Sequence, residues 1–136
     1  MKKFPVGKEA FRAITGDLNR SLEYLCLLEA AKSDPFSSTA TRDAFTLAAV
    51  VTYCRPFTKL RRRDGKKRAS MPKDLINDLS PDFQELQKKM RIDRNQMWSH
   101  PDEKAFNANN PIRVLSRTLI ARFKDLIKEV TSRLQK

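Results

Sequence analysis

Apolar side chains recur at steps of three and four residues along most of this 136-residue chain, and this spacing constrains its fold more than any other feature. Such steps place side chains on one face of an α-helix. Only three glycines occur and clusters of β-branched residues are few, which also favours helices over sheets. The clearest stripes lie in residues 8–32 (Phe11, Ile14, Leu18, Leu22, Leu25, Leu28) and 112–135 (Ile112, Leu115, Leu119, Phe123, Leu126, Val130, Leu134).

Two further helices are predicted between these stripes. Residues 40–60 contain a nearly unbroken apolar run, which is typical of a central helix covered on several sides. Pro56 should kink or interrupt this helix near Thr52, because a proline ring opposes the carbonyl four residues back. Residues 81–100 follow a capping serine, Ser80, and begin with a proline, which is favoured at the first helical position.

The remaining segments contain helix-breaking residues. Pro101 should end the third helix, and residues 72–79 are expected to form a short helical turn. A hydroxyl cap for the second helix is expected within residues 37–39. We therefore predict a single all-α domain over residues 1–136, arranged as an up-and-down four-helix bundle.

The formal net charge is +12, from 28 Lys and Arg against 16 Asp and Glu. This excess predicts attraction to polyanions, chiefly nucleic acid and secondarily anionic membrane, although a soluble protein can also simply be basic. The densest cluster is residues 61–68, expected to be a solvated loop because like charges so close repel one another. The side chains predicted to bind nucleic-acid phosphates are Arg55, Arg61, Arg62, Arg63, Lys66, Lys67, Arg68 and Arg91.

Several chemistries have no motif in this sequence. It has no Gly-rich phosphate loop, Ser-His-Asp arrangement or zinc-ligand spacing, so we predict neither a metal nor a cofactor. Cys26 and Cys54 are expected to be buried apolar residues in a reducing compartment. The first residues lack the apolar run of a signal peptide, and no stretch is long and apolar enough to span a bilayer. We expect a cytoplasmic protein without a membrane partner.

Residues 90–103 hold the only histidine and the only tryptophan, His100 and Trp98. Asp93 and His100 fall on one apolar face, about 20° apart on an ideal helix. Both need partners, because an unpaired buried polar group costs about 1–3 kcal/mol. His100 is either a helix-end histidine or part of a cleft, and Asp93 either orients it or pairs with Lys89. Trp98 is either a core or dimer-interface anchor, or a platform on which a base stacks.

The segment Arg94–His100 resembles the arginine–polar–histidine signature of the HEPN superfamily (higher eukaryotes and prokaryotes nucleotide-binding domains). In that signature an arginine, often followed by Asn or Asp, precedes a histidine by a few residues. The segment Tyr53–Phe57 is more weakly similar to an uncharacterised bacterial branch, and the helix order is similar over most of the chain. One difference is Pro101, which directly follows the histidine and restrains its backbone.

The resemblance implies a four-helix bundle that commonly dimerises and an endoribonuclease that needs no metal. On an ideal helix Arg94 lies about 120° from His100. The two would converge if the last turn unwinds before Pro101, or if two helices across a two-fold axis bring both pairs into one groove. RNA supplies its own nucleophile, the 2′-hydroxyl. His100 would be the general base or acid. Arg94 would stabilise the phosphate, Asn95 would orient the phosphate or ribose, and Asp93 would fix the tautomer of His100.

Three hypotheses follow. The first is a HEPN-like homodimer that binds and cleaves RNA, as a toxin-like or defence nuclease would. The second is a non-catalytic nucleic-acid-binding or regulatory bundle in which residues 61–68 do the binding. The third is a protein-interaction module, for example one half of a toxin–antitoxin pair, whose positive surface meets an acidic protein partner.

Overall fold

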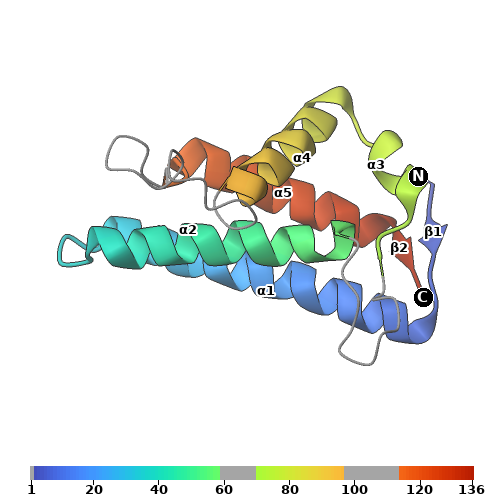
Figure 1. Ribbon diagram of the computed structural model, residues 1–136, viewed down its shortest axis with the longest axis horizontal. Coiled ribbons are helices and arrows are strands. Elements are labelled where there is room, and N and C mark those ends of the chain that lie inside the picture. Colours follow the sequence, from blue (N-terminus) through green and yellow to red (C-terminus); the bar gives the residue numbers. More distant parts are fainter. Residues whose placement is uncertain (1, 59–69, 97–113) are drawn as a thin grey trace.

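The computed structural model describes residues 2–58, 70–96 and 114–136, and nearly all of its regular structure is helical (Figure 1). The prediction of an all-α protein is therefore confirmed. Of the helices described, none combines the length and apolar character that a membrane span requires. In chain order the elements are β1 (Phe4–Pro5), α1 (Lys8–Ser33), α2 (Thr39–Cys54), the 3-10 helix η1 (Arg55–Phe57), α3 (Lys73–Asn77), α4 (Pro81–Arg94), α5 (Arg117–Arg133) and β2 (Leu134–Gln135).

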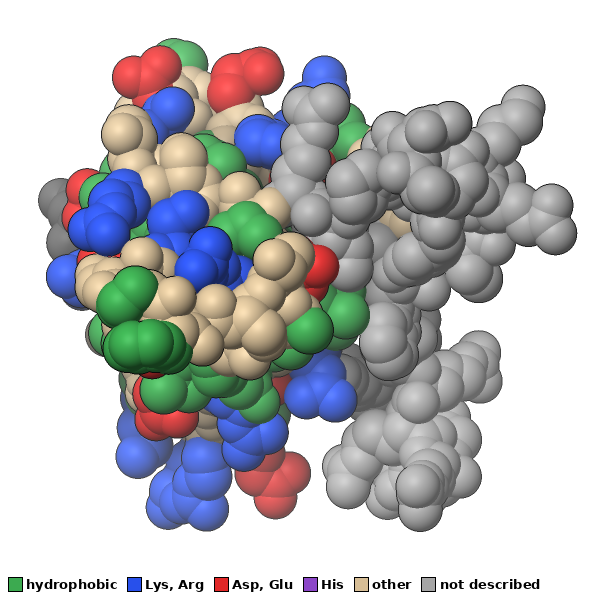
Figure 2. All heavy atoms as spheres, turned by 90° about the vertical axis from the view of Figure 1, so that its left-hand side faces the viewer, with side chains coloured by type: hydrophobic (Ala, Val, Ile, Leu, Met, Phe, Trp, Pro, Cys, Tyr) green, Lys and Arg blue, Asp and Glu red, His purple; other side chains and the backbone are tan. Residues whose placement is uncertain are grey.

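Helices α1 and α2 run side by side in opposite directions, and the turn between them forms the end of the molecule seen in Figure 2. Ser38 caps α2 as predicted, because its hydroxyl accepts the N–H of Thr41 at 3.1 Å. The buried hydroxyl of Ser21 donates to the carbonyl of Ala49 at 2.8 Å and so links the two helices. Helix α5 packs against α1, and α4 packs against α2 and α5.

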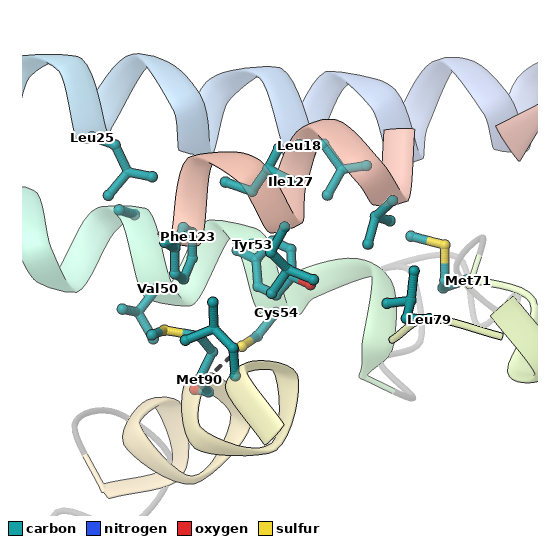
Figure 3. Packing of buried hydrophobic residues seen from close by; sticks show 14 of the residues in the cluster. Leu18, Leu25, Val50, Tyr53, Cys54, Met71, Leu79, Met90, Phe123 and Ile127 are labelled. Carbon is teal, nitrogen blue, oxygen red and sulfur yellow. Dashed lines mark hydrogen bonds between the residues drawn. The ribbon is translucent and has the colours of Figure 1, made fainter. Parts of the chain in front are cut away.

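The core forms where α1, α2, α4 and α5 meet around Tyr53 (Figure 3). The ring of Tyr53 lies 5.0 Å from that of Phe123 in an edge-to-face arrangement and 5.2 Å from that of Phe57. Four members of the predicted stripe in α1 are fully covered: Ile14, Leu18, Leu25 and Leu28. Burial of each such aliphatic side chain contributes about 1.5–3 kcal/mol, so the faces predicted from spacing do stabilise the fold.

Helix α2 ends at Cys54, not at residue 60 as predicted, and the chain continues as the 3-10 helix η1. The cause is Pro56, which has no N–H to donate to the carbonyl of Thr52. The N–H of Arg55 bonds to that carbonyl instead, in the tighter i→i+3 pattern. The interruption expected near Thr52 therefore falls at Arg55.

The third predicted helix is described only in part, and the fourth starts later than predicted. The α-helix of α4 ends at Arg94, residues 95–96 are π-helical, and residues 97–100 lie outside the described ranges. Helix α5 begins after Ser116, whose hydroxyl accepts the N–H of Leu119 at 3.1 Å, so Leu115 is buried but precedes the helix.

The last helix also ends earlier than predicted, at Arg133. Leu134–Gln135 form β2, which pairs in parallel with β1 at the start of the chain, and the N–H of Val6 bonds to the carbonyl of Gln135 at 2.8 Å. Leu134 is buried as expected, but from a strand. Apolar spacing alone does not reveal that Leu134 lies in a strand, because a residue four positions after Val130 fits a helical stripe equally well.

The two cysteines differ in environment. Cys54 is buried as predicted, whereas Cys26 is exposed, so the expectation for Cys26 was wrong. The reason is its position: one residue beyond the buried Leu25 turns the side chain about 100° away from the core.

Candidate functional site

The last turns of α4 pack against the end of α2 through two buried hydrogen bonds. The hydroxyl of Tyr53 donates to Oε1 of Gln87, and both side chains are buried. The thiol of Cys54 donates to the carbonyl of Met90 at 3.6 Å (Figure 3). Gln87 and Met90 are three residues apart, so they share one face of α4. These contacts fix the helix end that carries Arg94.

The environment of the Cys54 thiol is hydrophobic but influenced by nearby charges. Burial raises the pKa of Cys54 to about 12, while the positive charges of Arg94 and Arg91 lower it and the carboxylate of Asp93 raises it further. Because burial dominates, the thiol stays protonated at neutral pH and acts as a hydrogen-bond donor, not as a nucleophile. Three of the predicted site residues, Arg91, Asp93 and Arg94, therefore lie close enough to the buried thiol of Cys54 to influence its pKa.

Arg94 is the last α-helical residue of α4 and its side chain is half-buried. Its Nη1 donates to Oδ1 of the exposed Asn95 at 3.1 Å. A guanidinium carries five N–H donors in a fork that matches a phosphate, so this pair has the chemistry to hold one. Residues 95–96 are π-helical, a feature frequent at functional sites. The 120° angle predicted between Arg94 and His100 stays a prediction, because His100 lies outside the described residues.

Asp93 is partly buried and accepts a hydrogen bond from Nζ of Lys89 at 2.9 Å. This is one of the two partners that the sequence suggested for Asp93. The other partner, His100, lies outside the described residues, as does Trp98. An exposed i,i+4 pair of this kind contributes only about 0.3–0.5 kcal/mol, so it does not by itself fix Asp93.

Of the residues predicted to bind phosphates, the structure describes Arg55 and Arg91; the others, in residues 61–68, lie outside the described ranges. Arg55 is the first residue of η1, and its exposed side chain places Nη1 3.8 Å from Oδ1 of Asp17 in α1. Arg91 is exposed on α4. Together with Arg94 they contribute positive charge around the junction of α2, η1 and α4.

Sequence reasoning missed two residues that build this junction, Gln87 and Asp17. Gln87 had a signal: it lies four residues after Phe83 and three before Met90, so it is a polar residue on the apolar face of α4. Asp17 precedes the buried Leu18 without any pattern that would pair it with Arg55, because that contact joins distant parts of the chain.

Within the described ranges, no group of three or more His, Cys, Asp or Glu side chains is arranged to hold a metal ion. Comparisons with protein-family models, with curated proteins and with solved structures find no match for this chain. The helices place this protein in the all-α class. Its candidate site is a basic junction between the ends of α2 and α4.

Proposed function

We propose that this protein is a HEPN-like four-helix bundle that dimerises, binds RNA and cleaves it without a metal ion. The observation that carries the proposal is that the segment of the weaker resemblance packs on α4 just before Arg94, the residue that begins the motif. Tyr53 and Cys54, from the weaker segment, bond to Gln87 and Met90, which precede Arg94 on the same helix. The end of α2 and the last turns of α4, more than thirty residues apart in the sequence, are thus held together beside Arg94.

The arrangement of the long helices supports the bundle. Helices α1, α2, α4 and α5 alternate in direction along the chain (Figure 1), as in an up-and-down bundle. In the proposed dimer, a two-fold axis beside the end of α4 brings Arg94 of each chain into one groove with two copies of His100.

The proposed chemistry is an internal phosphoryl transfer within RNA. One His100 accepts the proton of a ribose 2′-hydroxyl, and the oxygen attacks the adjacent phosphorus. The bond from phosphorus to the 5′-oxygen breaks, and the leaving oxygen takes a proton from water, which recovers one from the protonated His100, so one histidine and one arginine suffice. The products are a 2′,3′-cyclic phosphate and a 5′-hydroxyl. Arg94 stabilises the charge of the pentacovalent transition state, and Asn95 holds the guanidinium and the phosphate in register.

The surrounding arginines would hold the rest of the strand. Arg55 and Arg91 lie on the two elements that flank Cys54, and residues 61–68 follow η1 closely in sequence. Contacts of this kind bind phosphates without reading bases and weaken as salt rises. The proposed substrate is therefore RNA, held through its backbone.

The test is cleavage of a single-stranded RNA in the presence of EDTA. We expect Arg94→Ala and His100→Ala to lose about 10²–10⁴ in rate, and products of the wild type to carry 2′,3′-cyclic phosphate ends. Arg122→Ala, which removes an exposed arginine of α5, is the matched control and should cleave normally. Circular dichroism establishes that the variants fold. Undiminished cleavage by both site variants would refute the nuclease.

One observation favours the non-catalytic alternative: Asp93 is paired with Lys89, a role in which it needs no histidine. In that case RNA binding would survive in the two site variants, and binding would depend on residues 61–68. Replacing the six cations there by Gln should then flatten the dependence of RNA affinity on salt. Affinity insensitive to both salt and these replacements would exclude this alternative.

A further inference from the structure

A second surface lies at the turn between α1 and α2 and has no part in the proposed RNA chemistry. Phe36 at this turn is 93% exposed, and Leu27 of α1 is 46% exposed. Figure 2 looks onto this end and shows hydrophobic side chains gathered beside Lys and Arg side chains. Isolated exposed apolar residues are ordinary, but an apolar patch rimmed by polar groups is typical of an interaction site.

The turn holds the backbone of Phe36 in a defined position. The N–H of Phe36 donates to Oδ1 of Asp34 at 2.9 Å, and the N–H of Ser37 donates to the carbonyl of Asp34 at 3.1 Å. Arg42 clamps the other side, with Nε 3.0 Å from Oγ of Ser37. A partner that covers Phe36 would therefore not have to order this turn first, which favours binding.

A hollow of about 460 Å³ adjoins the aromatic ring. Its walls come from α1, the turn and the start of α2, and they include the small side chains of Ala30 and Ala31 and the ring of Phe45. Polar residues also line the hollow, namely Asp34, Ser37, Ser38 and Thr41. A projecting ring beside a shallow hollow with one apolar side is suited to the apolar stripe of a helix, with one side chain entering the hollow and others packing on Phe36.

Three cations lie at this turn or bond to it, Lys32, Arg42 and Arg117, and one acid, Asp34, lines the hollow. Lys32 donates to the carbonyl of Leu115 at 2.9 Å, Arg42 donates to Ser37, and Arg117 donates to Oγ of Ser33 at 3.4 Å. These acceptors are neutral oxygens, so the bonds position the cations without cancelling their charge. At this face the cations of a second copy would lie opposite the same cations and be repelled, whereas the acidic side chains of a partner would be attracted.

We propose that this face, defined by Leu27, Phe36, Phe45 and the hollow between them, binds an acidic amphipathic helix of a partner protein. Apolar residues of that helix would cover Phe36 and Leu27, and its Asp and Glu residues would meet Lys32, Arg42 and Arg117. This inference does not depend on the ribonuclease proposal.

The probe is a displayed library of random helical peptides, selected on the full chain and depleted on the Phe36→Ser variant. Phe36 is almost fully exposed, so this substitution should leave the fold intact, as circular dichroism would verify. We expect enriched peptides to carry apolar residues at steps of three and four and an excess of Asp and Glu. The synthesised peptides should bind the wild type about tenfold more tightly than Phe36→Ser or Leu27→Ser, and more weakly as salt rises.

Ile92→Ser is the matched control, because Ile92 on α4 is also 46% exposed, and it should bind the peptides like the wild type. The proposal is overturned if no peptide depends on Phe36, if enriched peptides are neutral or basic, or if Ile92→Ser is as damaging as Leu27→Ser. It is also overturned if sedimentation shows self-association of the wild type that Phe36→Ser abolishes, since the face would then belong to a second copy.

Discussion

At the scale of single residues, the buried bond between Tyr53 and Gln87 joins the ends of α2 and α4. Tyr53→Phe removes the donor and leaves the amide oxygen of Gln87 without that partner in the core. We expect the free energy of unfolding to fall by about 1–3 kcal/mol, measured by urea denaturation. Tyr24→Phe, at a half-buried position on α1, is the control and should change stability less.

A double-mutant cycle separates this bond from general loss of packing. Gln87→Met alone leaves the hydroxyl of Tyr53 unpaired, whereas the double variant removes both polar groups together. Its destabilisation should therefore be clearly smaller than the sum of the two single effects. Additive effects would mean that the two groups do not interact in the folded protein.

The buried thiol of Cys54 predicts a loss of stability in alkaline solution. Its pKa is raised from 9.0 to about 12 in the folded chain, so the unfolded chain ionises first. The contribution of the protonated thiol to the free energy of unfolding is complete below pH 9.0 and is lost as pH rises towards 12. The loss is up to about 1.4 kcal/mol per pH unit. Burial raises the pKa of Tyr53 as well, and that tyrosine acts in the same direction.

The measurement is the free energy of unfolding at several pH values above 8. Cys54→Ala should show a shallower alkaline decline than the wild type, even though its stability is lower at neutral pH. Cys26→Ser, which removes the exposed thiol, should keep the wild-type decline. Equal slopes in the two cysteine variants would show that Cys54 is not the titrating group.

Whether a residue is buried was predicted better from its position on a helix than from its residue type. Cysteine is usually buried, which suits Cys54, but Cys26 lies one residue off the buried stripe and faces solvent. Conversely, Gln87 is polar yet buried, because it lies on the apolar stripe of α4 and accepts a hydrogen bond from Tyr53.

At the scale of elements, the starts of α1, α2 and α4 were predicted to within one residue because they depend on local chemistry, whereas α5 begins at Arg117 and not at residue 112. Ser38 and Ser80 were expected to cap helices and do so, and the short helix at 72–79 is present as α3. The end of α1 was also predicted to within one residue. Helices α2 and α5 end earlier than predicted, at a 3-10 transition and at the pairing of β2 with β1, and neither changes the apolar spacing.

Ser116 provides a test of the capping account, because its hydroxyl accepts the N–H of Leu119 and fixes the start of α5. We expect Ser116→Ala to lower the free energy of unfolding by about 1 kcal/mol and Ser116→Gly by only a few tenths. Thermal or urea denaturation checks this order. If Ala were the milder replacement, the helix start would not depend on the cap.

At the scale of the whole molecule, the candidate site depends on a contact that no local pattern specifies. The residues of the motif were visible in the sequence, but the approach of Arg94 and Arg91 to Cys54 arises only when α4 packs across α2. The positive charge, by contrast, was readable from composition alone. Charge suggested the class of ligand, and packing indicated where Arg55, Arg91 and Arg94 would meet it.

The most direct test of the proposed composite site is a mixing experiment with two inactive variants. Arg94→Ala and His100→Ala are purified separately and then mixed under conditions that allow subunit exchange, so that about half of the dimers carry one of each. If the site draws on both chains, RNA cleavage in EDTA should reappear in the mixture, because each mixed dimer contains one Arg94 and one His100. A mixture as inactive as its separate components, or a wild-type chain that cleaves RNA as a monomer, would contradict the account.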